Sequence, residues 1–197
     1  MEKDLYIFRH GQTDFNLHNI WQGCRCNLEL NIVGKLQAMD LGEQLYPLDL
    51  GIIYSSPLKR ALQTANLAAA RFKSLPRIEI IPNLREGNFG VAEGRSFEQL
   101  GKDYPDLLED ILNPTLKNWD AAFPGDDSES KHQIFNRVIG ALGEIVRYSS
   151  GNIGVSTHGG VISALTCGLG LRNVSFENCA VLHLKYDSSS RTFSQAE

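Results

Sequence analysis

Two segments of the sequence place a histidine beside a glycine directly after an apolar run. The first reads RHG at residues 9–11, and the second reads THGG at residues 157–160. Two further segments follow apolar runs in the same way: SSPLKR ends at Arg60, and LREG contains Arg85 and Glu86. If each run is a strand of one parallel sheet, these side chains gather at one edge, where open α/β sheets bind ligands.

These residue types favour an anion over a metal ion. Divalent metal sites need several carboxylates or cysteines with the histidines, whereas here arginines accompany a single carboxylate. Guanidinium groups bind phosphate oxygens bidentately, and a helix beginning at Gly159 would add backbone N–H donors. A histidine nitrogen could then attack phosphorus, and Glu86 could protonate the leaving oxygen. The residues alone do not choose between His10 and His158 as the nucleophile.

The elements that would hold these side chains alternate between strands and helices. Short apolar runs predict strands at Leu5–Phe8, Gly51–Ser56, Arg77–Pro82, Asn152–Thr157 and Ala180–Tyr186. Periodic patterns predict helices at Gly34–Tyr46, after Ser56 as N-cap with Pro57 first in the helix, at Glu129–Tyr148, and at Gly159–Gly170. This alternation predicts an α/β fold with a mostly parallel sheet covered on both faces.

The segment from about residue 88 to residue 130 differs from the rest. It is acidic, it contains three prolines, and it includes the run PGDDSES. We expect a small, partly helical insertion over the active site, within a single domain of residues 1–197. Trp119 and Phe123 either line a substrate pocket or, as composition favours, form the core of this insertion.

Composition limits the partners of the chain. Its 197 residues carry a formal net charge of −4, so no overall basic field would attract nucleic acid or an anionic membrane. No apolar run is long enough to span a bilayer. The four cysteines lack zinc or redox spacing, and no secretory leader is recognisable, so we expect a cytoplasmic protein with free thiols. The alternating run Ala180–Tyr186 suits a sheet edge, which leaves a homodimer open.

The motifs RHGQTDFN, SSPLKRALQTA, LREGNFGVAEG and STHGGVI resemble those of the histidine phosphatase superfamily, in its phosphoglycerate-mutase-like branch. The matches run in order from Leu5 to about Gly168. The resemblance implies a three-layer α/β/α sandwich, a phosphohistidine intermediate, and no metal ion or other cofactor. It also implies that His10 is the nucleophile and Glu86 the proton donor. The residues that it implies for the phosphate pocket and the substrate border are Arg9, Arg60, His158, Asn16, Gln22 and Gly23.

Among the activities of such proteins, the sequence favours a phosphomonoester phosphatase for a small phosphorylated metabolite. The mutases resemble one another in an ERHYG segment around the acid and an Arg-Arg pair in the insertion, whereas this chain has REGNFG and no such pair between residues 94 and 126. The alternatives are a cofactor-dependent phosphoglycerate mutase and a ribazole-phosphate phosphatase of cobalamin synthesis. A non-catalytic phospholigand-binding module is a further alternative, although binding alone would not need both a nucleophile and an acid.

Overall fold

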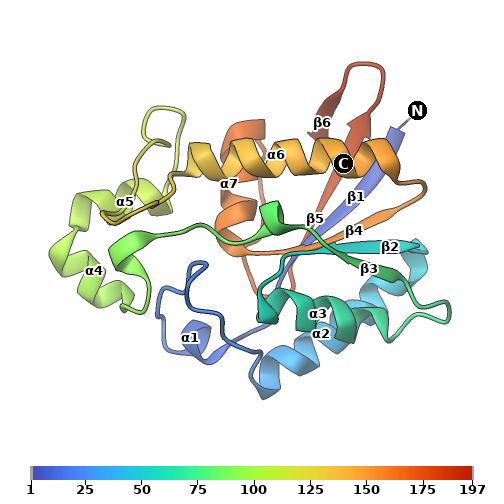
Figure 1. The fold of residues 1–197 in the computed structure, drawn as a ribbon, viewed down its shortest axis with the longest axis horizontal. Helices are drawn as coiled ribbons and strands as arrows, with labels where there is room; N and C mark the ends of the chain where they lie inside the picture. The colour runs from blue at the N-terminus through green and yellow to red at the C-terminus, as the bar shows by residue number, and fades with distance from the viewer. Residues whose placement is uncertain (1, 197) are drawn as a thin grey trace.

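The computed structural model describes residues 2–196, and its centre is a six-stranded β-sheet (Figure 1). The strands are β1 (Glu2–Arg9), β2 (Ile52–Ser55), β3 (Arg77–Ile80), β4 (Ile153–Thr157), β5 (Val181–Asp187) and β6 (Thr192–Gln195). Their order in the sheet is β3-β2-β4-β1-β5-β6. The first four strands run parallel and the last two pair antiparallel, so the predicted mostly parallel sheet is confirmed. Residues 1 and 197, which the predicted single domain includes, lie outside the described residues.

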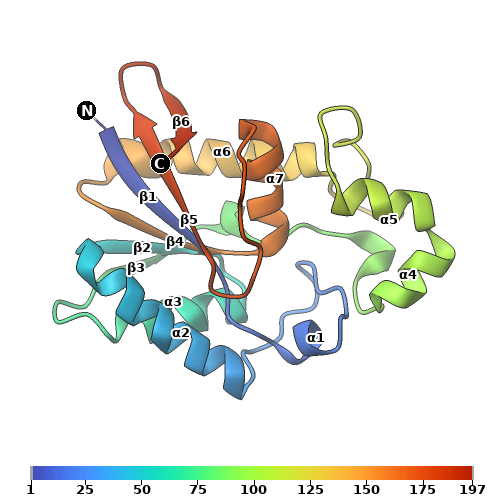
Figure 2. The ribbon, with the colours of Figure 1, turned by 180° about the vertical axis from the view of Figure 1, so that it is seen from behind.

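Helices cover both faces of this sheet, as Figures 1 and 2 show from opposite sides. α2 (Ile32–Leu45) and α3 (Lys59–Ala69) lie on one face, and α6 (Lys131–Tyr148) and α7 (Gly159–Leu169) lie on the other. The predicted α/β/α sandwich is therefore confirmed. The shorter elements are α1 (Asp14–Leu17), α4 (Phe97–Asp103), α5 (Pro105–Leu112) and the 3₁₀ helices η1 (Tyr46–Leu48), η2 (Pro82–Leu84) and η3 (Gly90–Ala92). None of the helices within residues 2–196 combines the length and the apolar character that crossing a membrane requires.

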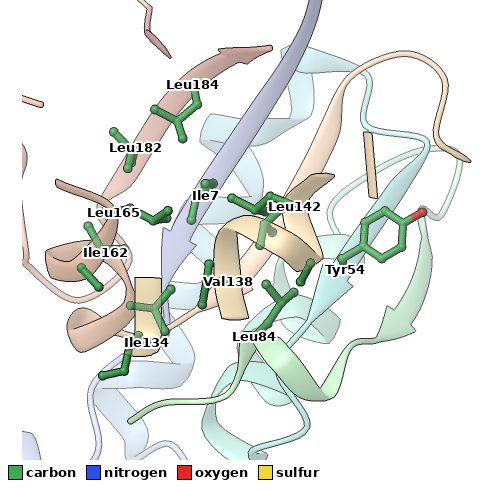
Figure 3. Close-up of a cluster of buried hydrophobic side chains, with 14 of the residues drawn as sticks. Ile7, Tyr54, Leu84, Ile134, Val138, Leu142, Ile162, Leu165, Leu182 and Leu184 are labelled. Atoms are coloured by element: carbon green, nitrogen blue, oxygen red, sulfur yellow. The ribbon is translucent and has the colours of Figure 1, made fainter. Parts of the chain in front are cut away.

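Two clusters of buried hydrophobic side chains join the layers. The larger cluster lies between the sheet and helices α6 and α7, where Ile7 and Leu184 of the strands meet Val138 and Ile162 of the helices (Figure 3). Successive residues of a strand face opposite sides of the sheet, so Ile7 enters this cluster while its neighbour Phe8 enters the second one, against α2 and α3. Burial on both faces fixes the register of β1 and hence the position of the residues that follow it.

Helix α3 begins two residues after the start that the sequence predicted. We expected Ser56 as the N-cap and Pro57 as the first helical residue, but the helix starts at Lys59. The hydroxyl of Ser56 instead forms a hydrogen bond of 2.7 Å with Nε2 of His158. The cap comes from a distant residue, because the backbone N–H of Lys59 donates to Oδ1 of Asn27 at 2.8 Å.

β5 is the second strand from an edge of the sheet, which agrees with the expectation that Ala180–Tyr186 lies nearer an edge, and β6 forms the edge itself. β5 pairs with β1 on one side and with β6 on the other, so both of its backbone edges are used within the chain. A homodimer that pairs through this strand is therefore ruled out. β6 has no apolar pattern that would predict it, because only Phe193 among its residues is even partly buried.

The insertion at residues 88–130 is partly helical, as predicted, and holds η3, α4 and α5. An aromatic cluster attaches it to the rest of the chain: the ring centroid of Trp21 lies 5.3 Å from that of Phe89 and 5.5 Å from that of Phe123. Phe123 is buried, and Trp119 stacks on a histidine of α6 at 4.2 Å. Neither residue belongs to the described residues that line the large cavity. The interpretation as insertion core is confirmed for Phe123, whereas Trp119 is only partly buried and packs on α6.

Candidate active site

A cavity of about 1030 Å³ lies where β1 and β4 end. Its polar lining comes mainly from the segments that follow the strands and includes Arg9, His10, Asn16, Gln22, Gly23, Arg60, Glu86, Gly159 and Gly160. Its apolar lining includes Phe15, Ile20, Trp21, Phe89, Phe97, Ile111, Leu112, Pro114, Leu116, Leu171 and Phe176. The structure thus gathers the sequence-predicted site residues in one place, with His158 completely buried beside His10.

His10 follows β1 and is held in one ring orientation. Its Nδ1 lies 2.7 Å from the carbonyl oxygen of Gly11, which can only accept, so Nδ1 carries a proton. Its Nε2 accepts a hydrogen bond of 3.1 Å from Nε of Arg60 and therefore holds a lone pair. Burial, with the positive charges of Arg60 and Arg9, holds the pKa of His10 well below its usual 6.5. The ring is neutral at neutral pH, which is the state a nucleophile needs.

His158 follows β4 and lies against His10, with ring centroids 5.2 Å apart. Its Nε2 is 2.7 Å from the hydroxyl oxygen of Ser56, whereas its Nδ1 is buried and has no partner within residues 2–196. Burial, followed by the charge of Arg60, holds the pKa of His158 well below 6.5. His158 is thus a second neutral imidazole, oriented by Ser56, with one ring nitrogen left for a ligand.

Two guanidinium groups bring positive charge to the two histidines. Arg60 is buried in the first turn of α3 and donates to His10 and to two backbone carbonyls, which leaves its remaining N–H groups for a ligand. Burial lowers the pKa of Arg60 to about 10, so it stays charged at neutral pH. Arg9 has a buried Nε without a partner in the described chain. Arg85, which the sequence placed at the same sheet edge, forms an ion pair with Glu129 instead.

Glu86 lies at the N-terminus of α7. Its Oε1 accepts from the backbone N–H of Gly87 at 2.9 Å, and its Oε2 accepts from that of Gly160 at 3.0 Å. A Cβ at Gly160 would come within 2.4 Å of Oε1, so only glycine allows the carboxylate this close to the helix. A Cβ at Gly159 would lie 3.3 Å from Nε of Arg9. One helix start therefore seats both the carboxylate and a guanidinium group.

Three loop residues complete the polar lining. Oδ1 of Asn16 accepts from both the backbone N–H and the hydroxyl of Thr13 at 3.1 Å, so the amide oxygen is fixed and the Nδ2 donors point elsewhere. Oε1 of Gln22 is buried and lacks a partner within residues 2–196. Gly23 has a φ of +60°, and a Cβ there would lie 2.2 Å from the Glu93 carboxyl group that holds the neighbouring backbone.

Three residues of this site are not predicted from the sequence as site residues. Ser56 is predicted only as a helix cap, although it stands at a strand end. Asn178, in the loop before β5, donates from Nδ2 to the carbonyl oxygen of His10 at 2.9 Å. Lys131, the first residue of α6, lines the cavity and is 6% exposed. No motif surrounds Asn178 or Lys131, so only the fold reveals them.

The polar end of the cavity is suited to a tetrahedral anion. Of the buried side-chain atoms without a partner in the described residues, Nε of Arg9 and Nδ1 of His158 can donate to an anion, whereas Oε1 of Gln22 can only accept. Two arginines and the N-terminus of α7 add positive potential at the same place. Within residues 2–196, no three or more histidine, cysteine, aspartate or glutamate side chains are grouped so as to hold a metal ion. An anion held here would lie beside Nε2 of His10.

Comparisons with known proteins agree with this arrangement. A family model described as the Histidine phosphatase superfamily (branch 1) matches residues 5–196. The metal-independent phosphoserine phosphatase of Arabidopsis thaliana is 31% identical over 164 residues, which are 82% of this chain and 66% of that protein. The uncharacterized phosphatase PhoE of Bacillus subtilis (strain 168) is 31% identical over 160 residues, 81% of this chain and 73% of that protein. Among solved structures, phosphoglycerate mutase from Bacillus anthracis str. Sterne has a TM-score of 0.86 at 26% identity, covering 100% of this chain and 92% of that one.

Proposed function

The chain belongs to the histidine phosphatase superfamily (branch 1), and we propose that it hydrolyses a small phosphorylated metabolite through a phosphohistidine at His10, without a metal ion. The observation that carries the proposal is the state of His10, a neutral ring with its Nε2 lone pair beside Arg60 in a cavity. Relatives that are named as phosphatases support hydrolysis, and one of them is named metal-independent.

The reaction has two steps. First, Nε2 of His10 attacks phosphorus, the bond to the leaving oxygen breaks, and Glu86 gives its proton to that oxygen. Arg9, Arg60 and the Nδ1–H of His158 stabilise the charge on the three non-bridging oxygens. Second, a water attacks the phosphohistidine and gives its proton to Glu86 while the P–N bond breaks. Inorganic phosphate leaves, and His10 and Glu86 return to their starting states.

The structure favours His10 over His158 as the nucleophile, a choice that residue types alone leave open. His10 lines the cavity, and its Nε2 carries the lone pair among the two arginines. His158 lies completely buried behind it and has one nitrogen engaged by Ser56. We therefore assign His158 to holding a phosphoryl oxygen.

Three further residues would bind the substrate, and a fourth, Gly23, would position Arg60. Asn16 and Gln22 have hydrogen-bonding capacity left in their amide groups. The carbonyl of Gly23 positions Arg60 by accepting from its Nη2 at 2.8 Å. The backbone N–H of Gly159 at the start of α7 adds a donor of the kind that binds phosphate oxygens.

Hydrolysis is favoured over phosphoryl transfer by the insertion side of the cavity. Leu112 and Leu116 line the cavity, yet they are 48% and 67% exposed. Water therefore reaches this wall. A mutase has to keep its phosphoenzyme away from water, because hydrolysis would destroy the intermediate that it must pass on.

The experiment is phosphate release from p-nitrophenyl phosphate in EDTA, with His10→Ala as the matched variant. We expect turnover that EDTA leaves unchanged and that His10→Ala abolishes. Quenching the wild-type reaction in alkali should trap a phosphoprotein that acid destroys, as a phosphohistidine requires. Turnover that EDTA removes would overturn metal independence, and turnover that survives His10→Ala would overturn the mechanism. Phosphoglycerate mutase activity without phosphatase activity would favour the mutase.

A further inference from the structure

Lys131 is a cation in a position that general physical chemistry disfavours. It is the first residue of α6, where the helix dipole is positive and acidic side chains are preferred. Its side chain is 6% exposed and lines the cavity, so its ammonium group has lost most of its hydration. Burial accordingly lowers the pKa of Lys131. A charge held in such a place needs a partner to offset its desolvation.

The described chain supplies no direct partner for this ammonium group. Within residues 2–196, Nζ of Lys131 makes neither an ion pair nor a hydrogen bond, and its recorded contact is with the face of the Phe89 ring, 5.7 Å from the ring centroid. Exposed lysines such as Lys59 and Lys102 pair with glutamates, although they need partners far less. Lys131 therefore combines burial with the absence of a direct partner within residues 2–196.

Neither of the two titratable groups that act on Lys131 contacts its ammonium group directly. Glu86 attracts it electrostatically, but both carboxylate oxygens of Glu86 already accept backbone N–H bonds at the start of α7. The other group is the thiol of Cys167, and burial raises the pKa of that thiol, so it is uncharged at neutral pH. An anionic group of a molecule bound in the cavity would give the ammonium group of Lys131 a direct partner.

Lys131 lies close enough to the reacting groups for one small molecule to contact both. The Phe89 ring has its face toward Nζ of Lys131, and its Cζ would lie 3.0 Å from a Cβ placed on Gly160. That same Cβ would lie 2.4 Å from Glu86. The ring thus reaches from Lys131 to the carboxylate, and the cavity of about 1030 Å³ has ample room for more than a phosphate.

We propose that Lys131 is a specificity-determining residue that binds a second anionic group of the substrate. The natural substrate is then a phosphomonoester that carries a carboxylate or a second phosphate a few atoms from the phosphoryl group. The inference rests on the proposed function, since it places the phosphoryl group beside His10. Lys131 would then recognise the part of the substrate that lies beyond the phosphoryl group.

Three esters with one carbon chain test the proposal: propyl phosphate, 3-(phosphonooxy)propanoate and propane-1,3-diol bisphosphate. Wild-type enzyme should have a kcat/KM about 10- to 100-fold higher for the esters with a second anion than for propyl phosphate, the size of a charge-assisted hydrogen bond. The ester with the higher value identifies the second anion as carboxylate or phosphate. Equal values for all three esters in the wild type would overturn the proposal without any variant.

Lys131→Met should remove this preference mainly through KM, and Lys131→Arg should restore most of it. Lys117→Met is the matched control, because Lys117 is exposed, lies in the insertion and does not line the cavity. An equal loss on all three esters in Lys131→Met would show that the lysine acts on Glu86 or on the fold, which contradicts the proposal. Loss of the preference in Arg172→Met but not in Lys131→Met would also contradict it, because Arg172 is the exposed cation of the same cavity.

The outcome for the chemistry is separate. Turnover of p-nitrophenyl phosphate that depends on His10, together with no preference among the three esters, would leave the phosphatase mechanism standing and overturn only the role of Lys131. No turnover of any ester would instead overturn the proposed function.

Discussion

The cavity has two ends that are built in opposite ways. At the phosphoryl end, His10, Arg60, Glu86 and His158 are each at most 7% exposed, and backbone or side-chain hydrogen bonds fix their orientation. At the other end, apolar side chains of the insertion form the wall, and Leu116 is 67% exposed. The first end is rigid and polar, whereas the second is apolar and open.

The difference indicates that the polar end carries out the reaction and that the apolar end determines which substrate fits. The polar end sits where parallel strands terminate, and its residues are held by elements that the hydrophobic clusters fix in register. Displacing one of them by a fraction of an ångström alters the reaction itself. The apolar end makes contacts without directional bonds, so a change there alters which molecule fits. Substitutions at the two ends should therefore have different kinetic signatures.

The largest effect is expected at the nucleophile. His10→Ala should lower kcat by a factor on the order of 10⁴ or more, and no phosphoenzyme should form. His158→Ala should lower kcat less, on the order of 10²–10³, and still form the phosphoenzyme, because it removes one oxygen-binding group. Alkali-quenched phosphoprotein and steady-state rates check both variants. A phosphoenzyme in His10→Ala but not in His158→Ala would reverse the two roles.

The next effect concerns the leaving group. Glu86→Gln should slow alkyl phosphates by about 10²–10⁴-fold and p-nitrophenyl phosphate far less, because a good leaving group needs little protonation. Glu177→Gln is the matched control, since Glu177 is an exposed carboxylate that lines the same cavity. Rates over a series of esters with increasing leaving-group pKa check the prediction. A uniform loss along the series would give Glu86 a role other than proton transfer.

The phosphoryl end should also weaken the fold as the pH falls. The pKa values of His10 and His158 lie well below 6.5 in the folded chain, so below pH 6.5 the unfolded chain binds more protons. The free energy of unfolding then falls with pH by about 1.4 kcal/mol per pH unit for each histidine, until each folded pKa is reached. His158→Gln should remove one such contribution from the slope between pH 7.5 and 5.5.

Denaturant titrations at several pH values measure that slope. His18→Gln provides the control, because His18 is exposed and lies outside the cavity. Identical slopes for the wild type and His158→Gln would mean that burial of this imidazole carries no proton-linked cost, and that the phosphoryl end is less constrained than its contacts indicate.

The sequence predicts the polar end of the cavity better than the residues that surround it. The polar end could be predicted because its residues stand in short contiguous motifs at strand ends. Residues 9–11 and 157–160 are therefore recognisable in the sequence without knowledge of the fold. Lys131 and Asn178 could not be predicted, because each stands alone in the sequence and meets the site only through a helix start or a loop. The start of α3 was misplaced for a related reason, since Asn27 caps it from a distant loop.

The elements show the same limit. The strands β1, β2 and β4 and the long helices bury apolar residues, and their apolar pattern located them to within a few residues. β3 buries none of its four residues, but the alternation of Ile78 and Ile80 located it as well. β6 is an edge strand that partly buries Phe193 alone, so the physical driving force that creates a pattern is absent there. A strand that lacks both burial and apolar alternation, as β6 does, is one that sequence periodicity does not detect.

The smallest effect is expected at the apolar end. Leu116→Ser should raise KM for 1-naphthyl phosphate about two- to fivefold and change kcat little. Because Leu116 is largely exposed, its contact with the substrate buries only part of its apolar surface, and the binding free energy from that contact is correspondingly small. Leu75→Ser is the control, since Leu75 is 71% exposed and does not line the cavity. KM and kcat for ethyl phosphate, which is too small to reach the insertion, should be alike in the wild type and both variants. A fall in kcat for ethyl phosphate in Leu116→Ser would mean that the insertion positions the reacting groups. The polar end would then not act alone in catalysis, and the two ends of the cavity would not have separate roles.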